Sequence, residues 1–227
     1  MNTSTMLSTS MWVDFIAVAV LLMNLMMLSS SRIRTCIRIV AAQGILIGLM
    51  PIINEYPVIA LGTIASSSLS IVLKGVVFPW LLFRALQEAN IRKEVEPVGG
   101  YPLSLLMGVV IFAMSFWLSA RLLYTNTPVS PLVAPVSFAT FFTGVFVIVS
   151  RMKAITQVIG YLILENGIYF FGSAFLGEQT VLVELAILLD IFAAVFVMGI
   201  AIFHISREFD HIDTEKLSEL KDLITEK

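Results

Sequence analysis

The run QVIGYLILENG (residues 157–167) lies inside a long apolar stretch, 154–175, and decides how the rest of the chain is interpreted. A second apolar stretch, 180–204, follows after a very short acidic turn. Both stretches are long enough to cross a bilayer, because ~20 residues at ~1.5 Å rise per residue span a hydrocarbon core of ~30 Å. Each stretch therefore carries a carboxylate near the middle of the membrane, Glu165 in the first and Asp190 in the second.

A charged carboxylate at this depth is costly, by at least ~2.5 kcal/mol on insertion scales, so it usually faces a partner, water or the interior of a helix bundle. Burial disfavours the charged form of a carboxylate and a nearby cation favours it. Where both act together, the group can gain and lose a proton. Glu165 and Asp190, on neighbouring helices, therefore predict an ion path.

A third stretch, ASSSLSIVLKGVVFP (residues 65–79), places Lys74 a little to the cytoplasmic side of the middle of its own span. Ser70 lies one helical turn away on the same side of the helix. Pro79 lacks a backbone donor and should kink the helix just after Lys74. A lysine can also extend along its helix to the membrane surface, but here that surface lies beyond the reach of the side chain. We expect Lys74 to be buried and to belong to the ion path.

The composition is that of a polytopic membrane protein. Of the 227 residues, 58% are hydrophobic and 13% are charged, and the mean hydropathy is +0.95, values outside the range of soluble domains. Spans and short connections use up most of the chain, so a separate soluble catalytic domain is not expected. The formal charge of −2 and the lack of a basic face exclude a nucleic-acid partner.

No cofactor or metal site is expected. Cys36 is the single cysteine, which excludes an intrachain disulfide, a cysteine-held cluster and a structural zinc site. The two histidines, His204 and His211, do not lie at mid-span, where the axial ligands of a membrane haem would be needed.

Seven apolar spans can be distinguished, so the expected fold is an all-α, polytopic integral membrane protein. Twelve of the 14 Lys and Arg residues fall on one side of these spans, Arg121 falls on the other side, and Lys74 lies inside a span. By the positive-inside rule, the N-terminus is then outside and the C-terminus is in the cytoplasm. The expected spans are residues 11–30, 37–54, 58–83, 102–123, 131–149, 154–176 and 180–205.

A charged cytoplasmic loop, residues 91–100, is the natural division of the chain. It separates an N-terminal three-helix part, 1–90, from a C-terminal four-helix part, 101–206. A polar cytoplasmic tail, 207–227, follows the last span.

The two mid-membrane stretches resemble a known family. GYLILENG (160–167), followed by DIFAAVFVM (190–198), resembles the E component of hydrogenase-4 and formate-hydrogenlyase-type membrane complexes. In that family a Gly-Tyr-x-x-x-Glu-Asn-Gly run precedes an Asp-Ile/Ala-x-Phe-Ala-x-Val helix. The stretch around Lys74, which lies five residues before Pro79, is similar to that family's third helix. The resemblance covers most of the chain and is densest in residues 150–206.

Residues 131–206 are in turn similar to the small K-type subunit of respiratory complex I and to the C-type subunit of multi-subunit cation/proton antiporters. In the K-type subunit, basic residues open the second helix, which bears a membrane glutamate, and the third helix bears another. Arg151 and Lys153, Glu165, and Asp190 occupy the corresponding places here, with aspartate as the second acid.

Four further residues are candidates for the ion path. Glu184 lies six residues before the second carboxylate, roughly 9 Å nearer the outside, and could extend the relay or sit in an outer vestibule. His204, at the inner end of the last span, is a weaker candidate with a structural alternative. Tyr161 and Tyr169 each lie one turn from Glu165 and could hydrogen-bond to it.

The resemblance implies a membrane-arm subunit of a complex-I-like, energy-converting oxidoreductase in the cell membrane. Such a subunit catalyses nothing itself. Its expected partners are antiporter-like and quinone-module-type membrane subunits, with nickel–iron and iron–sulfur subunits elsewhere in the complex. The alternative is a subunit of a cation/proton antiporter without a redox partner. A free-standing retinal protein is disfavoured, because retinal would need a lysine in the last span.

Overall fold

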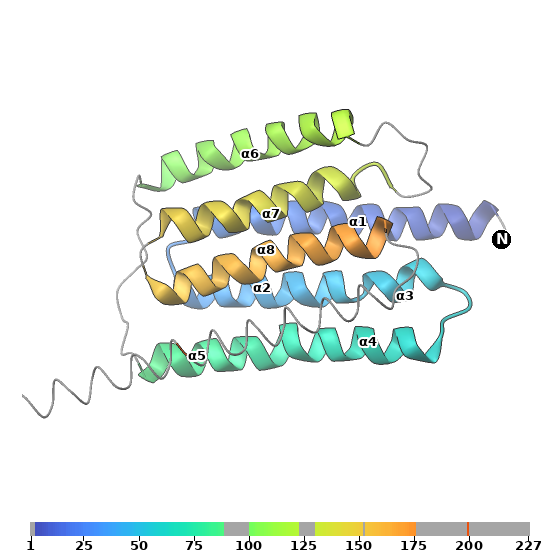
Figure 1. Cartoon of the computed structure of the whole chain (residues 1–227), viewed down its shortest axis with the longest axis horizontal. Helices are drawn as coiled ribbons and strands as arrows, with labels where there is room; N and C mark the ends of the chain where they lie inside the picture. Colours follow the sequence, from blue (N-terminus) through green and yellow to red (C-terminus); the bar gives the residue numbers. More distant parts are fainter. Residues whose placement is uncertain (1–2, 89–99, 123–129, 152, 176–198, 200–227) are drawn as a thin grey trace, which may run out of the picture.

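Most of the described residues are helical, in agreement with the predicted all-α membrane fold. The computed structural model describes residues 3–88, 100–122, 130–151, 153–175 and 199, and no strand occurs among them (Figure 1). The elements are α1 (Thr3–Ser29), α2 (Ile33–Gly48), α3 (Met50–Glu55), α4 (Leu61–Val72), the π-helical segment η1 (Leu73–Val77), α5 (Phe78–Glu88), α6 (Gly100–Leu122), α7 (Val133–Ser150) and α8 (Ala154–Phe175).

Five of the described helical segments are long and apolar enough to cross a membrane: Thr9–Ser29, Ile33–Glu55, Leu61–Gln87, Pro102–Leu122 and Val133–Ser150. Helix α8 has 22 residues and hence also the length to cross. The second span is 23 residues long and begins earlier than the expected 37–54, because α2 already starts at Ile33. The expected seventh span, 180–205, falls outside the described residues.

The helices lie alongside one another in a bundle (Figure 1). Helices α7 and α8 form the most extensive pair, α1 packs on α7 and α2, and α2 packs on α8. The continuous α4–η1–α5 segment packs on α2 at one side of the bundle, and α6 packs on α7 and α1 at the other. Helices α1 and α2 thus pack directly against α7 and α8, although they are distant in sequence.

Glycines allow α7 and α8 to pack with backbone against backbone. A Cβ atom at Gly167 would lie 2.6 Å from the backbone nitrogen of Phe141 and 2.9 Å from the carbonyl oxygen of Ser137. A Cβ at Gly144 would overlap backbone atoms of Leu164. Such close approach is the usual role of small residues between membrane helices.

Helix α2 approaches the third span through the spacing Gly44-x-x-x-Gly48. A Cβ at Gly44 would lie 2.7 Å from Cβ of Lys74, and one at Gly48 would lie 2.8 Å from Cγ1 of Ile71. The absence of a side chain at Gly44 therefore leaves room for the stem of Lys74 beside α2.

Two apolar clusters fill the bundle, and a layer of polar side chains lies between them. Each of α1, α2, α7 and α8 contributes to both clusters, and along each helix the change from one cluster to the other occurs around buried polar residues. Lys74 precedes the residues of α5 that belong to the first cluster. We call the following six buried residues the polar layer: Asn24, Gln43, Lys74, Thr140, Glu165 and Asn166.

Arg151, which directly follows α7, is almost fully buried, with 1% of its surface exposed. Its Nη2 donates to the carbonyl oxygens of Met27 and Ser30, each at 3.3 Å. These carbonyls lie at the C-terminal end of α1, where the helix dipole is negative and favours a cation. Arg151 therefore joins the start of α8 to the end of α1.

Candidate functional site

The third span changes its helical geometry at Lys74. Segment η1 (Leu73–Val77) is π-helical, and the backbone N–H of Phe78 bonds to the carbonyl of Leu73, five residues earlier. Pro79 follows directly and has no N–H of its own to donate. The sequence predicted the distortion just after Lys74, whereas the π-turn begins one residue before Lys74 and includes it. Single π-turns of this kind occur frequently at functional sites.

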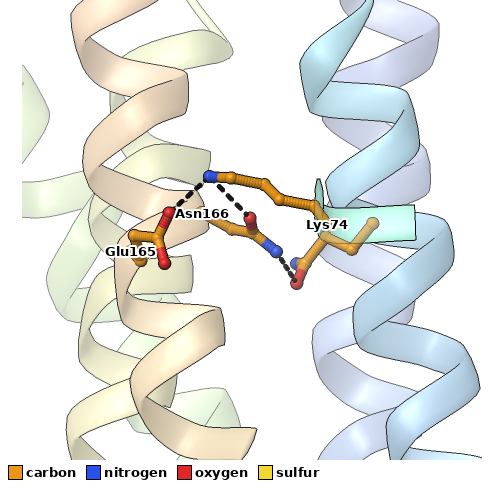
Figure 2. A network of polar contacts seen from close by, with 4 residues as sticks. Lys74, Glu165 and Asn166 are labelled. Carbon is orange, nitrogen blue, oxygen red and sulfur yellow. Dashed lines mark hydrogen bonds and ion pairs between the residues drawn. The ribbon is translucent and has the colours of Figure 1, made fainter. Parts of the chain in front are cut away.

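Lys74 and Glu165 form a buried ion pair. Nζ of Lys74 lies 2.6 Å from Oε1 of Glu165, and the two side chains are only 4% and 3% exposed. Figure 2 shows the lysine side chain extending from its own helix toward α8, where Glu165 and Asn166 are adjacent. The Lys74 side chain is therefore turned into the bundle and away from the membrane surface.

Both members of the pair lie near the middle of their helices. Glu165 is eleven residues from the first residue of α8 and ten from the last. Lys74 is thirteen residues after Leu61, where α4 starts, and fourteen before Glu88, where α5 ends. A bundle that crosses the membrane therefore holds the pair at mid-depth, where water is scarce and charges interact strongly.

Two more side chains of α8 contact the lysine ammonium group. Oδ1 of Asn166 accepts from Nζ of Lys74 at 3.5 Å, and the ring centroid of Tyr169 lies 4.7 Å from the same Nζ. An aromatic face at this distance attracts a cation through its quadrupole. Helix α8 therefore supplies a carboxylate, an amide and an aromatic face to a single ammonium group.

The two tyrosines take different places from those expected. Beyond the ion pair, neither oxygen of Glu165 has a hydrogen bond to another described residue, so the expected bonds from Tyr161 and Tyr169 are absent. The ring of Tyr169 is turned to Lys74 instead. Tyr161 packs against the first apolar cluster, one turn toward the other end of α8.

Three of the candidate residues, Asp190, Glu184 and His204, lie outside the described residues. Their relation to the ion pair stays a prediction. Among the described residues, no group of three or more His, Cys, Asp or Glu side chains is arranged to hold a metal ion.

Comparisons with known proteins show what parts of this chain are similar to. Residues 132–222 match the family model of NADH-ubiquinone/plastoquinone oxidoreductase chain 4L. This is the K-type subunit, and the match begins almost where the sequence resemblance placed it. We call residues 132–222 the chain 4L-like region. It contains α7, α8 and Glu165, whereas Lys74 lies outside it, on the third span.

The chain is also similar to two proteins over a wider range. It is 29% identical over 219 residues to an uncharacterized protein of Mycobacterium tuberculosis, a match covering 94% of this chain and 97% of that protein. It is 29% identical over 119 residues to hydrogenase-4 component E of Escherichia coli, covering 52% of this chain and 55% of component E. The matched region therefore covers about half of this chain and about half of component E. No solved structure matches it significantly.

Taken together, these matches confirm the resemblance to the component E family and to the K-type subunit. They also relate the chain to membrane subunits of the complex-I-like type. In this chain the chain 4L-like region provides the acid of the ion pair, and the N-terminal helices provide the base.

Removal of Lys74 should leave an uncompensated buried carboxylate. We expect Lys74→Met to lower the free energy of unfolding by ~3–5 kcal/mol, the usual cost of removing one partner from a buried ion pair. The double variant Lys74→Met/Glu165→Gln should recover most of this loss, because no charge is then buried. Thermal melting of the protein in detergent measures both effects, and strictly additive losses in the double variant would contradict the ion pair.

Proposed function

We propose that this chain is a membrane-arm subunit of a complex-I-like energy-converting hydrogenase or formate-hydrogenlyase-type complex in the cytoplasmic membrane. In this role it supplies Glu165, Asp190, Lys74 and Glu184 to a path for protons or sodium ions. Redox chemistry in nickel–iron and iron–sulfur subunits drives the ions. In this role the redox reaction takes place in those other subunits.

The observation that carries the proposal is the buried pair of Lys74 and Glu165 at mid-helix. Burial penalises separated charges, so the charge of each group depends strongly on its partner and on the surrounding groups. A small change in the surroundings then moves a proton between Nζ and Oε1, or releases either group to exchange with a neighbour. Such a pair responds to charge movement in adjacent subunits.

Charge inside the bundle also supports membership of a larger assembly. Charged residues at membrane depth are usually functional and face a partner or a water-filled cavity. Antiporter-like and quinone-module-type membrane subunits are the partners proposed, and the match of residues 132–222 to chain 4L of NADH-ubiquinone/plastoquinone oxidoreductase supports this choice.

The alternative is a subunit of a multi-subunit cation/proton antiporter. The sequence similarity of residues 131–206 to the C-type antiporter subunit favours it, and the ion pair would serve an antiporter equally well. The two proposals differ in their partners, because an antiporter contains no nickel–iron or iron–sulfur subunit.

Purification of the tagged full-length chain in a mild detergent distinguishes between the two proposals. We expect nickel–iron and iron–sulfur subunits to copurify, and mass spectrometry to identify them. Copurification of antiporter subunits without any redox subunit would favour the alternative. A monodisperse, isolated chain that transports ions in liposomes would contradict both.

A further inference from the structure

A chain of hydrogen bonds leads away from the ion pair into the polar layer. Nζ of Lys74 donates to Oδ1 of Asn166 at 3.5 Å, and Nδ2 of Asn166 donates to Oε1 of Gln43 at 3.4 Å. Figure 2 shows the first of these steps beside the bond to Glu165. This series of hydrogen bonds thus runs from η1 to α8 and on to α2.

Two further steps continue it across the bundle. Nε2 of Gln43 donates to Oδ1 of Asn24 at 3.0 Å, and Nδ2 of Asn24 donates to Oγ1 of Thr140 at 2.8 Å. The hydroxyl of Thr140 donates in turn to the carbonyl oxygen of Val136 at 2.8 Å. We call Asn166, Gln43, Asn24 and Thr140 the amide chain. It links four helices, α8, α2, α1 and α7.

Every bond of the amide chain points in the same direction, away from Lys74. The two ends fix this direction, because an ammonium group can only donate and the one hydroxyl proton of Thr140 is used on the carbonyl of Val136. The oxygen of Thr140 must then accept from Asn24, and each amide in between is held in one orientation. The result is that Asn166 presents its oxygen, and not its NH2 group, to the ammonium.

Primary amides bind protons far too weakly to accept or release them near neutral pH, so this chain of bonds does not conduct protons. It can, however, fix the position of a flexible lysine. Bonds in such a chain polarise one another, and in a buried site they are electrostatically stronger than in water. We propose that the amide chain is a positioning device that holds the ammonium of Lys74 against Glu165, while ions and protons exchange on the carboxylate side of the pair.

This inference rests on the proposed function, in which the pair serves ion translocation. It assigns a role to Gln43 and Asn24, which are linked to the pair through Asn166. The surroundings of Oε2 of Glu165 fit this role, because this atom is buried and has no hydrogen bond to any described residue. The lysine side of the pair is thus tethered, and the carboxylate keeps an oxygen for exchange.

Gln43→Met tests the proposal, because methionine fills a similar volume and removes two bonds of the amide chain. Gln157→Met is its matched control, since Gln157 donates to the carbonyl of Arg151 at 3.4 Å, away from the polar layer. Thr140→Val removes the hydroxyl at the far end with little change of shape, and Thr140→Ser restores it. Each variant is compared in the intact complex, with assembly followed on native gels.

We measure ions translocated per electron pair in proteoliposomes. Gln43→Met should lower this ratio about three- to tenfold, the range set by the loss of one or two hydrogen bonds, with redox turnover and assembly preserved. Thr140→Val should lower it less, because it acts further from Lys74. Thr140→Ser and Gln157→Met should match the wild type. Equal ratios in Gln43→Met and Gln157→Met would overturn the positioning role.

A second measurement does not depend on translocation. The infrared carboxylate bands of Glu165, identified by their loss in Glu165→Gln, report the strength of the ion pair in the resting complex. They should shift in Gln43→Met and stay unchanged in Gln157→Met, and bands that stay unchanged in both would overturn the inference. If Glu165→Gln itself translocates normally, the proposed function fails. If Glu165→Gln is inactive while Gln43→Met translocates like the wild type, only the positioning role fails.

Discussion

Replacement of Glu165 by glutamine should abolish coupled ion translocation while the complex still assembles and keeps most of its redox activity. The amide has nearly the volume of the carboxylate and can still hydrogen-bond to Lys74, which is 2.6 Å from Oε1 in the wild type. It cannot exchange a proton. Proton or sodium uptake into proteoliposomes, measured together with hydrogen production or formate oxidation, shows whether the two activities separate.

Two further variants show whether the loss of translocation depends on the carboxylate group of Glu165. Glu165→Asp keeps the carboxylate on a shorter stem and should retain part of the translocation. Glu55→Gln is the matched control, because Glu55 lies at the end of α3 and accepts a bond from the backbone N–H of Ala60 outside the polar layer. A translocation loss in Glu55→Gln as large as that in Glu165→Gln would mean that the effect is not specific to the ion pair.

Alanine at Gly144 should destabilise the protein severely. Its Cβ would overlap backbone atoms of Leu164 and Gly160 on α8, and backbone of two packed helices cannot move aside as a flexible side chain can. We expect a loss above ~3 kcal/mol, at the upper end of overpacking costs, together with weak accumulation in the membrane. Thermal melting in detergent and the yield of assembled complex measure both.

Gly62→Ala is the control for this substitution. Gly62 also lies in a helix, α4, but a Cβ there would meet nothing within 4 Å. It should therefore leave stability unchanged or raise it slightly, since alanine favours the helix more than glycine does. Equal melting temperatures for Gly144→Ala and Gly62→Ala would contradict the close packing of α7 on α8.

Much of the fold follows from hydropathy. Apolar runs of about 20 residues can satisfy their backbone hydrogen bonds in lipid only as helices, so the helical spans were predictable to within a few residues at most ends. The start of α2 was placed late, at residue 37 and not at Ile33. Arg32 and Arg34 explain this error, because charges suggested a connection where the chain is already helical from Ile33 on.

The two charges of the site were also visible in the sequence. Lys74 and Glu165 stand out because each interrupts an apolar run at a depth where charge is costly. Their pairing was not predictable, since hydropathy does not determine which spans are neighbours or how each helix is rotated about its axis. The close approach of α2 to Lys74 at Gly44 shows how strongly a single glycine influences this packing.

Gln43, Thr140 and Asn24 were not predicted to belong to the site. Uncharged polar side chains are common in membrane helices, and a threonine there usually bonds to its own backbone. A weak signal existed: Asn24 and Gln43 are both amides inside apolar runs, where an unpaired amide is costly. Neither residue alone indicated that four helices meet through such groups.

The most direct test of the central claim is whether Glu165 changes its protonation state during turnover. Infrared difference spectra of the working complex, recorded with glutamate labelled at its side-chain carbon, detect a carboxyl group as it gains or loses a proton. We predict a carboxyl signal that moves with the label and disappears in Glu165→Gln. The role proposed for the buried pair would be contradicted if the wild-type complex translocates ions without such a signal. It would also be contradicted if the signal stays unchanged in Glu165→Gln.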